Sequence, residues 1–266
     1  MNCIHILFSK DRALQLRAQL HSIREFVGGD VEHVVLYHPS PEHQESYDTV
    51  KSEFSEFRFV RQINFKEDVE RLVEESQAPY VFFTPDDGLF IRETNLDNMA
   101  TSSVIDKHIF SLRLGSHLTE SHPVGRKAQG LPKFTTREEG PHGERLSFPW
   151  EGPLDWGYPL ALDGHIFESR QILAFMRMVN YRTPTSLEVM LQHFVPLIFK
   201  DGMCDALSHF VSIPWNVVTD EMNNLNSGIG SDIFLEAFKQ QKNIKVDHIY
   251  GSLPIGCHQE YELEFV

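Results

Sequence analysis

The amino-terminal part of the chain alternates short apolar runs with longer segments whose apolar residues recur at helical spacing. The apolar runs predict buried strands at 4–8, 34–37, 58–63 and 80–83. The segments between them predict helices at 13–27, 47–57 and 65–76. Crossover helices between successive strands indicate an α/β fold with a mainly parallel sheet and helices on both faces.

The fourth apolar run ends in Thr84-Pro85-Asp86-Asp87-Gly88, which places two acids directly after a strand. Parallel strands present their carboxyl ends at one edge of a sheet, so this loop and the loop 9–12 should face one crevice. Adjacent carboxylates repel each other unless a positive charge is near, and a divalent cation bound to a substrate phosphate meets that need. The same residues also favour a simple turn, and these residues alone leave both interpretations open.

Two large enzyme classes lack their signatures in this sequence. The first strand is not followed by a GxGxxG motif, and the chain has no GxxxxGK[ST] motif. A dinucleotide-binding Rossmann fingerprint and a P-loop are therefore excluded.

The order of these features resembles the nucleotide-sugar glycosyltransferases of the GT-A fold, with a family-two-like, degenerate DxD motif. The resemblance rests on Phe8-Ser9-Lys10-Asp11-Arg12 before a helix, followed by the strand that ends in Asp86-Asp87, and it covers about residues 1–115. It implies a divalent metal, Mn²⁺ or Mg²⁺, on the donor diphosphate. Asp87 matches the direct metal ligand, and Asp86 matches the acid that touches the ribose or a metal-bound water. Pro85 departs from strict DxD.

The resemblance also implies roles for further residues. The residues expected to line the nucleotide are Ser9, Lys10, Asp11, Arg12 and Asp86, with Lys66 and Asp68 as neighbours. A last metal ligand often comes from a carboxyl-terminal histidine, for which His258 and His209 are candidates. The alternative for Lys10 and Arg12 is that they form a solvated helix start. The alternative for either histidine is a role at the surface or in the core.

The remaining sequence is expected to form the acceptor-binding half, residues 116–266, of a single domain whose nucleotide-binding half is 1–115. A helix is predicted at 95–104 and a strand at 109–114. Residues 115–152 are rich in Gly, Pro, His and charge without periodicity, which predicts a long loop. An acceptor-side lid that orders on binding is the favoured interpretation, and an idle surface loop is the alternative.

Two tryptophans and a tyrosine lie among acids in the segment 150–167. Aromatic faces beside carboxylates suit sugar rings, so Trp156 and Tyr158 are expected to seat the acceptor. Packing of Trp150 and Trp156 in the core is the alternative. Asp163 lies in the same segment, either as a general base or as part of a turn.

Glu188 lies at the start of a predicted apolar helix. Thr185 and Glu188 have the spacing of a capping box, which gives Glu188 a structural role. The resemblance implies that an acid at this place is the general base, for which a carboxylate of raised pKa near the acceptor hydroxyl is needed. Beyond it, strands are predicted at 208–213, 248–250 and 260–265, and helices at 214–218 and 232–240.

Charge and composition restrict the partners. A formal net charge of −14 disfavours binding to nucleic acid or to an anionic membrane surface. No apolar run approaches the ~18–20 residues of a transmembrane helix, and no signal peptide is evident. The three cysteines form no CxxC pair, which favours a reducing, cytoplasmic location.

The sequence therefore predicts a metal-dependent glycosyltransferase that moves a sugar from a nucleoside diphosphate sugar to a hydroxyl of a saccharide or other acceptor. Two alternatives remain open: a sugar-phosphate nucleotidyltransferase and a non-catalytic sugar- or nucleotide-binding relative.

Overall fold

The computed structural model of the chain describes residues 3–99, 101–123, 125–216 and 226–266. Within these ranges one nine-stranded sheet has the order β11-β12-β14-β8-β13-β5-β1-β3-β4. Its strands are β1 (Cys3–Lys10), β3 (Val31–His38), β4 (Arg58–Arg61), β5 (Tyr80–Pro85), β8 (His108–Ser111), β11 (Thr136–Gly140), β12 (Gly143–Phe148), β13 (His165–Glu168) and β14 (Asp201–Asp205). Short strands form three further pairs: β2 (Val27–Gly28) with β7 (Thr94–Asn95), β6 (Gly88–Phe90) with β15 (Phe210–Ser212), and β9 (Glu120–Ser121) with β10 (Lys127–Ala128).

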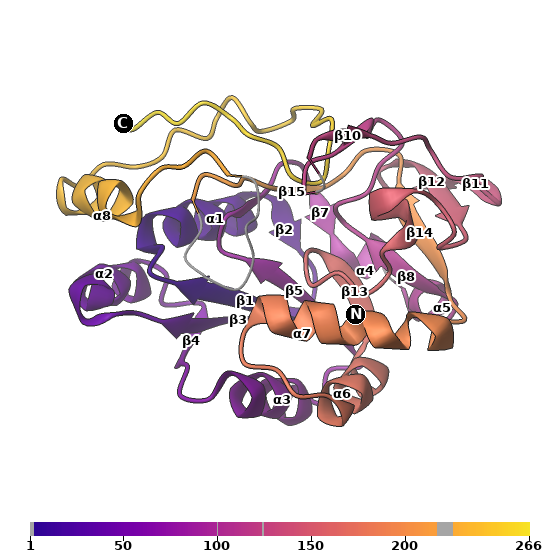
Figure 1. Cartoon of the computed structure of the whole chain (residues 1–266), viewed down its shortest axis with the longest axis horizontal. Coiled ribbons are helices and arrows are strands. Elements are labelled where there is room, and N and C mark those ends of the chain that lie inside the picture. Colours follow the sequence, from indigo (N-terminus) through magenta and orange to yellow (C-terminus); the bar gives the residue numbers. More distant parts are fainter. Residues whose placement is uncertain (1–2, 100, 124, 217–225) are drawn as a thin grey trace.

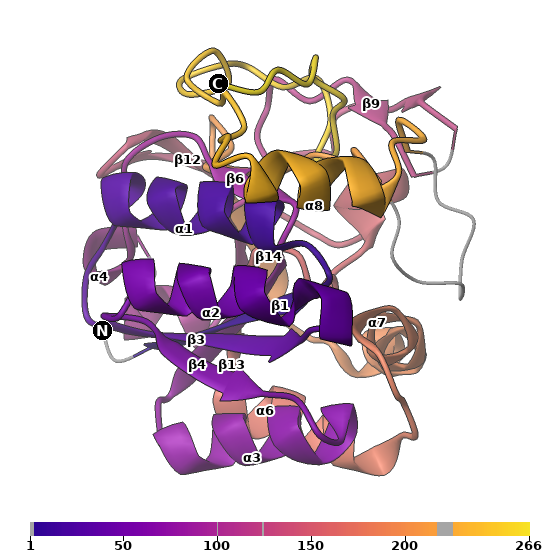
Figure 2. The ribbon, with the colours of Figure 1, turned by 90° about the vertical axis from the view of Figure 1, so that its left-hand side faces the viewer.

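Helices cover both faces of the sheet (Figures 1 and 2). The α-helices are α1 (Ala13–Phe26), α2 (Gln44–Glu53), α3 (Phe65–Ser76), α4 (Leu96–Met99), α5 (Ser102–Ile105), α6 (Ser169–Met178), α7 (Pro184–Leu191) and α8 (Ser231–Lys239). The 3₁₀ turns are η1 (Pro41–His43), η2 (Leu154–Gly157) and η3 (Gln192–Leu197). Figure 2 shows α1, α2 and α8 on one side of β1, β3 and β4, and α3 and α6 on the other.

Strand β1 illustrates why the sheet is buried on both faces. Side chains alternate across a strand, so Cys3 and Leu7 enter one core, while Ile4, Ile6 and Phe8 enter the other. The first core contains apolar residues of α1 and α2, and the second contains those of α3 and α6. An apolar run without alternation is the pattern of such a parallel, doubly covered strand, and the four predicted amino-terminal strands are confirmed.

In the middle of the sheet, β13 runs opposite to both of its neighbours. β1, β3, β4 and β5 pair in parallel, as do β8 and β14, whereas β13 lies antiparallel between β5 and β8. The beginning of β13 therefore lies at the edge where β5 and β8 end. The N–H of Leu112, just after β8, donates to the carbonyl of Gly164, just before β13, at 2.8 Å.

The segment 115–152 differs from the expected structureless loop. β11 and β12 form an antiparallel hairpin in it, and β12 pairs with β14, so the hairpin extends the main sheet. β11 carries charged residues on both faces and is largely exposed. It therefore lacks the alternation of apolar and polar residues that predicts a strand. Both predicted halves of the chain thus contribute strands to one sheet.

Other element predictions agree in part. The predicted helices 65–76 and 232–240 correspond to α3 and α8, whereas the helix expected at 95–104 is two short helices, α4 and α5. The strand expected at 109–114 is the shorter β8, and that at 208–213 is β15. The final strand pair is wrong, because the carboxyl-terminal segment makes isolated bridges instead, between Ile244 and Phe265 and between His258 and Ser212. The predicted helix 214–218 falls partly outside the described residues.

Candidate functional site

The acid pair lies at the carboxyl ends of β1 and β5, where the first-strand loop meets it as predicted. Arg12, next to the start of α1, places Nη1 2.9 Å from Asp86 Oδ1 and 2.9 Å from Asp87 Oδ2. Its Nη2 donates to the backbone carbonyl of Asn216. One buried guanidinium therefore pairs with both acids.

Asp86 is held by the first-strand loop on its other oxygen as well. Asp86 Oδ2 accepts hydrogen bonds from Ser9 Oγ at 2.8 Å and from the Lys10 N–H at 3.2 Å. Burial raises the pKa of Asp86 to about 6, Arg12 opposes that rise, and Asp87 adds to it. Tyr47, a residue that sequence reasoning missed, completes the cluster by hydrogen bonding Ser9 Oγ at 2.6 Å.

Asp11 shapes the turn between β1 and α1. Its φ of 52° lies in the left-handed region, and its Oδ1 accepts the Ser40 N–H at 2.6 Å. Asp11 thereby ties the loop after β1 to the loop after β3. The side chain of Lys10 is exposed beside it.

Glu188 is not the capping residue that its spacing from Thr185 suggested. α7 begins earlier, with Thr183 as N-cap, Pro184 as its first residue, and a reciprocal capping box between Thr183 and Ser186. Proline favours the first helical position, where its missing N–H costs nothing, and this sets the start of the helix. The Glu188 carboxylate is therefore free of capping.

The Glu188 carboxylate instead turns toward the segment that precedes β13. Its Oε2 accepts the Leu162 N–H at 2.7 Å, and its Oε1 accepts Tyr158 Oη at 3.2 Å. Burial raises the pKa of Glu188, while these two hydrogen bonds and Arg113 lower it. A half-buried carboxylate with a raised pKa beside a cavity has the properties of a general base.

The cavity beside Glu188 has a volume of about 490 Å³. Its walls come from the ends of β1 and β5, the segment before β13, the start of α7 and the carboxyl-terminal segment. They include Phe8, Pro85, Arg113, Ser121, Pro123, Leu154, Asp155, Tyr158, Leu162, Asp163, Pro184, Thr185, Glu188, Val189 and His258. Pro85, which directly precedes the acid pair, lines the cavity together with Glu188, whereas Asp86 and Asp87 do not line it.

A buried arginine organises the floor of this cavity. Arg113 Nη2 donates to Asp155 Oδ1 at 2.9 Å, and Nη1 donates to Asp163 Oδ2 at 3.0 Å. Ser212 Oγ also donates to Asp163, at 2.9 Å. Asp163 is thus committed to ion pairing and hydrogen bonding, which disfavours its predicted role as a base. Sequence reasoning missed Arg113, whose signal was a charged residue at the end of a predicted buried strand.

His258 lies on the cavity wall rather than in the acid pair. Its Nε2 is 3.4 Å from Asp163 Oδ2, and burial lowers its pKa, so the imidazole is neutral near pH 7. The other candidate histidine, His209, is buried, and its Nε2 lies 3.2 Å from Asp205 Oδ2.

Three residues that were predicted to bind a substrate make contacts within the fold instead. Trp156 is fully buried, with its ring against Phe134 and Phe148, so it offers no face to an acceptor. Lys66 Nζ donates to the carbonyls of Met176 and Val179 at the end of α6. Asp68 accepts the N–H groups of residues 63 and 64 and thereby stabilises the start of α3. The structure brings Tyr158, but neither Trp156 nor Lys66, to the cavity.

The donor set of the acid pair is suited to a hard divalent ion, because carboxylate oxygens are the ligands that Mg²⁺ and Mn²⁺ prefer. Asp87 has one oxygen that Arg12 does not use. Arg12 Nη1 stands between the two acids, so an ion bridging them requires the guanidinium to move. In the part of the chain that the structure describes, no group of three or more His, Cys, Asp or Glu side chains is arranged to hold a metal.

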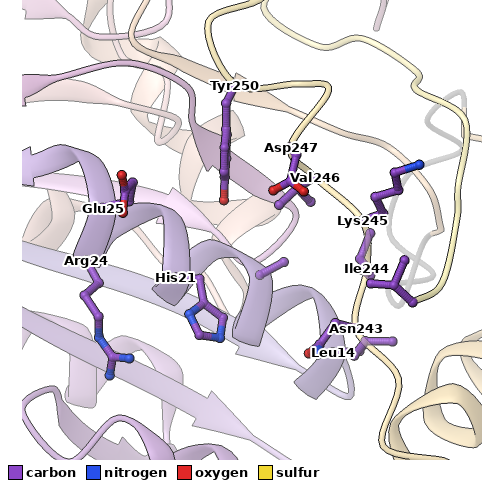
Figure 3. A pocket seen from close by; sticks show the side chains of 12 residues that line it. Leu14, His21, Arg24, Glu25, Asn243, Ile244, Lys245, Val246, Asp247 and Tyr250 are labelled. Carbon is purple, nitrogen blue, oxygen red and sulfur yellow. The ribbon is translucent and has the colours of Figure 1, made fainter.

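A second cleft, of about 570 Å³, lies away from the acid pair between α1 and the carboxyl-terminal segment (Figure 3). His21, Arg24 and Glu25 face it from α1, and Lys245, Asp247 and Tyr250 face it from the other side. His21 and Arg24 already pair with acids of α2 and the turn after it, Glu53 and Glu56. None of the predicted site residues lines this cleft.

The overall fold was compared with known proteins. No protein-family model matches the chain. Among solved structures, a crystal structure of TarS from S. aureus, a GT-A-type glycosyltransferase, superposes with a TM-score of 0.50 at 12% identity, covering 80% of this chain and 36% of that one. The chain has the GT-A glycosyltransferase fold. The likeness to TarS confirms the predicted fold class.

A curated relative with similar sequence is also a glycosyltransferase. The bifunctional glycosyltransferase pgtA of Dictyostelium discoideum is 24% identical over 184 residues, which cover 63% of this chain. The chain spans only 24% of the length of that relative. A structure of TarS residues 1–349 with UDP has a TM-score of 0.48 at 12% identity, covering 90% of this chain and 65% of that one. Within the described part of this GT-A chain, no helix is both long enough and apolar enough to cross a membrane.

Proposed function

We propose that the protein is a glycosyltransferase that moves a sugar from a nucleoside diphosphate sugar to an acceptor hydroxyl. The observation that carries this proposal is a cavity that has Glu188 on its wall and begins beside the acid pair. Pro85, next to the acid pair, lines it from one side, and Glu188 lines it from another. The name of the sequence relative, a glycosyltransferase, supports the same reaction class.

The donor would lie along the carboxyl ends of β1 and β5. Ser9, Lys10, Asp11 and Arg12 would contact its nucleotide, and the exposed side chain of Lys10 offers donors for phosphate oxygens. Asp87, with Asp86, would hold Mn²⁺ or Mg²⁺. When bound, that ion supplies positive charge that stabilises the departing diphosphate.

The acceptor would lie in the cavity against Tyr158. In the transfer, the acceptor oxygen forms a bond to the anomeric carbon, and the bond from that carbon to the diphosphate oxygen breaks. The proton of the acceptor hydroxyl passes to Glu188, which is why a half-buried carboxylate with a raised pKa suits the position. The side chains around Glu188 position the hydroxyl, and the walls of the cavity limit access of water.

A cytoplasmic location forms part of the proposal. Its support is that Cys3, Cys204 and Cys257 are all buried free thiols.

A thermal-shift panel tests the donor part of the proposal. It would contain UDP, GDP, ADP, CDP and dTDP and their common sugar conjugates, each with and without Mn²⁺. A ligand that binds only the folded state at ~100-fold excess over Kd adds about 2.7 kcal/mol of stability, a readily measured shift. The proposal predicts that one base stabilises the protein and that Asp87→Asn reduces this shift, whereas Asp48→Asn, an exposed acid on α2, leaves it unchanged. Absence of any shift across the panel would contradict the proposal.

A further inference from the structure

The position between Asp86 and Asp87 already holds a cation that belongs to the chain. A single nitrogen, Arg12 Nη1, lies 2.9 Å from an oxygen of each acid. The side chains of Arg12 and Asp86 are 8% and 4% exposed, so water screens this contact little. The guanidinium is therefore a specific, buried partner of the pair.

A divalent ion bridging the same oxygens would need the same space. Mg²⁺ and similar ions lie about 2.0–2.6 Å from carboxylate oxygens, closer than a guanidinium nitrogen. An ion between Asp86 Oδ1 and Asp87 Oδ2 would overlap Arg12 Nη1. It would also place a double positive charge against the guanidinium in a site of low water content, where like charges repel strongly.

The rest of Asp86 gives the ion no alternative position. Asp86 Oδ2 already accepts two hydrogen bonds, from Ser9 and from the Lys10 N–H, so this carboxylate is held in place from both sides. Only Asp87 has an oxygen outside these contacts. Removal of Arg12 would leave two adjacent, partly desolvated carboxylates with a strong requirement for another cation.

Resting on the function proposed above, we propose that Arg12 and the divalent ion compete for Asp86 and Asp87. In the free protein Arg12 neutralises the pair and keeps the affinity for metal low. When an ion binds the pair, the guanidinium leaves it and becomes available to the diphosphate. Arg12 Nε has no hydrogen-bond partner among the described residues, so the side chain has a donor left for this second contact.

Metal binding to the free protein, without any donor, tests the competition directly. Free Mn²⁺ is counted by electron paramagnetic resonance while wild type, Arg12→Met and Arg17→Met are titrated at one pH. Arg12→Met is expected to bind Mn²⁺ about tenfold more tightly or better than wild type, because the competing charge is gone. Arg17 lies on the same helix and pairs with Glu53, so Arg17→Met controls for the loss of one positive charge. Equal affinity in wild type and a folded Arg12→Met would overturn the inference.

A measurement on the wild-type side chain covers the case in which Arg12→Met does not fold. The ¹⁵N signals of the Arg12 guanidinium are assigned by their loss in Arg12→Lys and followed while Mg²⁺ is added. The inference predicts that they shift in proportion to the Mg²⁺ bound, as measured by calorimetry. Mg²⁺ that binds in an Asp87-dependent way while the Arg12 signals stay unchanged would disprove the competition. Because neither experiment contains nucleotide, failure here is separate from failure of the thermal-shift panel.

Discussion

Tyr158 Oη donates a hydrogen bond to Glu188 Oε1 across 3.2 Å, although the two residues belong to different segments of the acceptor side. The bond stabilises the ionised carboxylate, because a hydroxyl donor favours the charged form of its acceptor. Burial acts on Glu188 in the opposite direction and raises its pKa. The balance of these two effects sets the pH at which Glu188 can accept a proton.

Tyr158→Phe should shift the pH dependence of transfer. Loss of the hydroxyl removes an influence that lowers the pKa of Glu188, so that pKa rises further. A base must be deprotonated to act, and the acid limb of kcat/KM should therefore move to higher pH. Tyr181→Phe is the matched control, because its hydroxyl bonds Glu70 instead. An unmoved acid limb would show that Tyr158 does not tune the base.

Glu188→Gln should remove proton transfer while leaving donor binding intact. The expected loss in kcat is about 10²–10⁴-fold, the usual contribution of a general base. The amide keeps the size of the side chain, and the nucleotide shift in the thermal panel should stay within error. Glu151→Gln changes an exposed acid and serves as control. Full transfer activity in Glu188→Gln would exclude this residue as the base.

Gly88→Ala should destabilise the protein through a single steric contact. A Cβ at position 88 would lie 1.9 Å from Cζ of Phe210, whose ring is fully buried. Overpacking of this kind costs about 1–3 kcal/mol in the free energy of unfolding. Phe210→Leu in the same chain should recover part of that loss, whereas Gly130→Ala, where a Cβ meets nothing within 4 Å, should be neutral. Urea denaturation measures all three.

Acidification should weaken the fold through the pair His5 and His33. Their Nδ1 atoms lie 3.0 Å apart, and burial lowers the pKa of His33 to about 4. The unfolded chain binds the proton from about pH 6.5 downward, so the stabilisation is complete above pH 6.5 and declines as the pH falls to 4. The decline for His33 is about 3 kcal/mol in the free energy of unfolding.

Urea melts at a series of pH values measure this decline. His33→Gln should flatten the profile between pH 6.5 and 4, because it removes the depressed pKa. His248→Gln, at an exposed position, should leave the profile as in wild type. A wild-type profile without slope in this window would refute the prediction.

The sequence predicted that the first-strand loop meets the acid pair because both follow strands in a regular order. Arg12 follows the first apolar run and Asp86 the fourth, and parallel pairing alone brings them to one edge. The contact itself, in which one nitrogen is shared by two acids, could not be predicted, because spacing along the chain does not fix a side-chain rotamer.

The roles of residues around Glu188 were harder to predict from the sequence, for reasons that individual residues show. Thr185 and Glu188 satisfied a local motif, but Pro184 shifted the start of the helix and made Thr183 the cap. The sequence around Trp156 was compatible both with a ring that stacks on a sugar and with a core residue. Its packing against Phe148 shows that it is a core residue. Arg113 became part of the site through Asp155, which lies far from it in sequence.

The reversal of β13 has a consequence for how this protein could be re-engineered. After β8 the chain passes to the far edge of the sheet, where β12 pairs with β14, and it returns to the middle of the sheet before β13. The hydrogen bond from Leu112 to Gly164 joins the two points. The segment between them, including Tyr158 and the β11–β12 hairpin, is therefore an insertion with adjacent ends, and such segments tolerate exchange well. A chimaera cut at 112 and 164 would exchange much of the acceptor wall and leave the strands that carry Arg12, Asp86 and Asp87 uninterrupted. Recognition of the proposed acceptor could then change while the residues proposed to bind the donor stay the same.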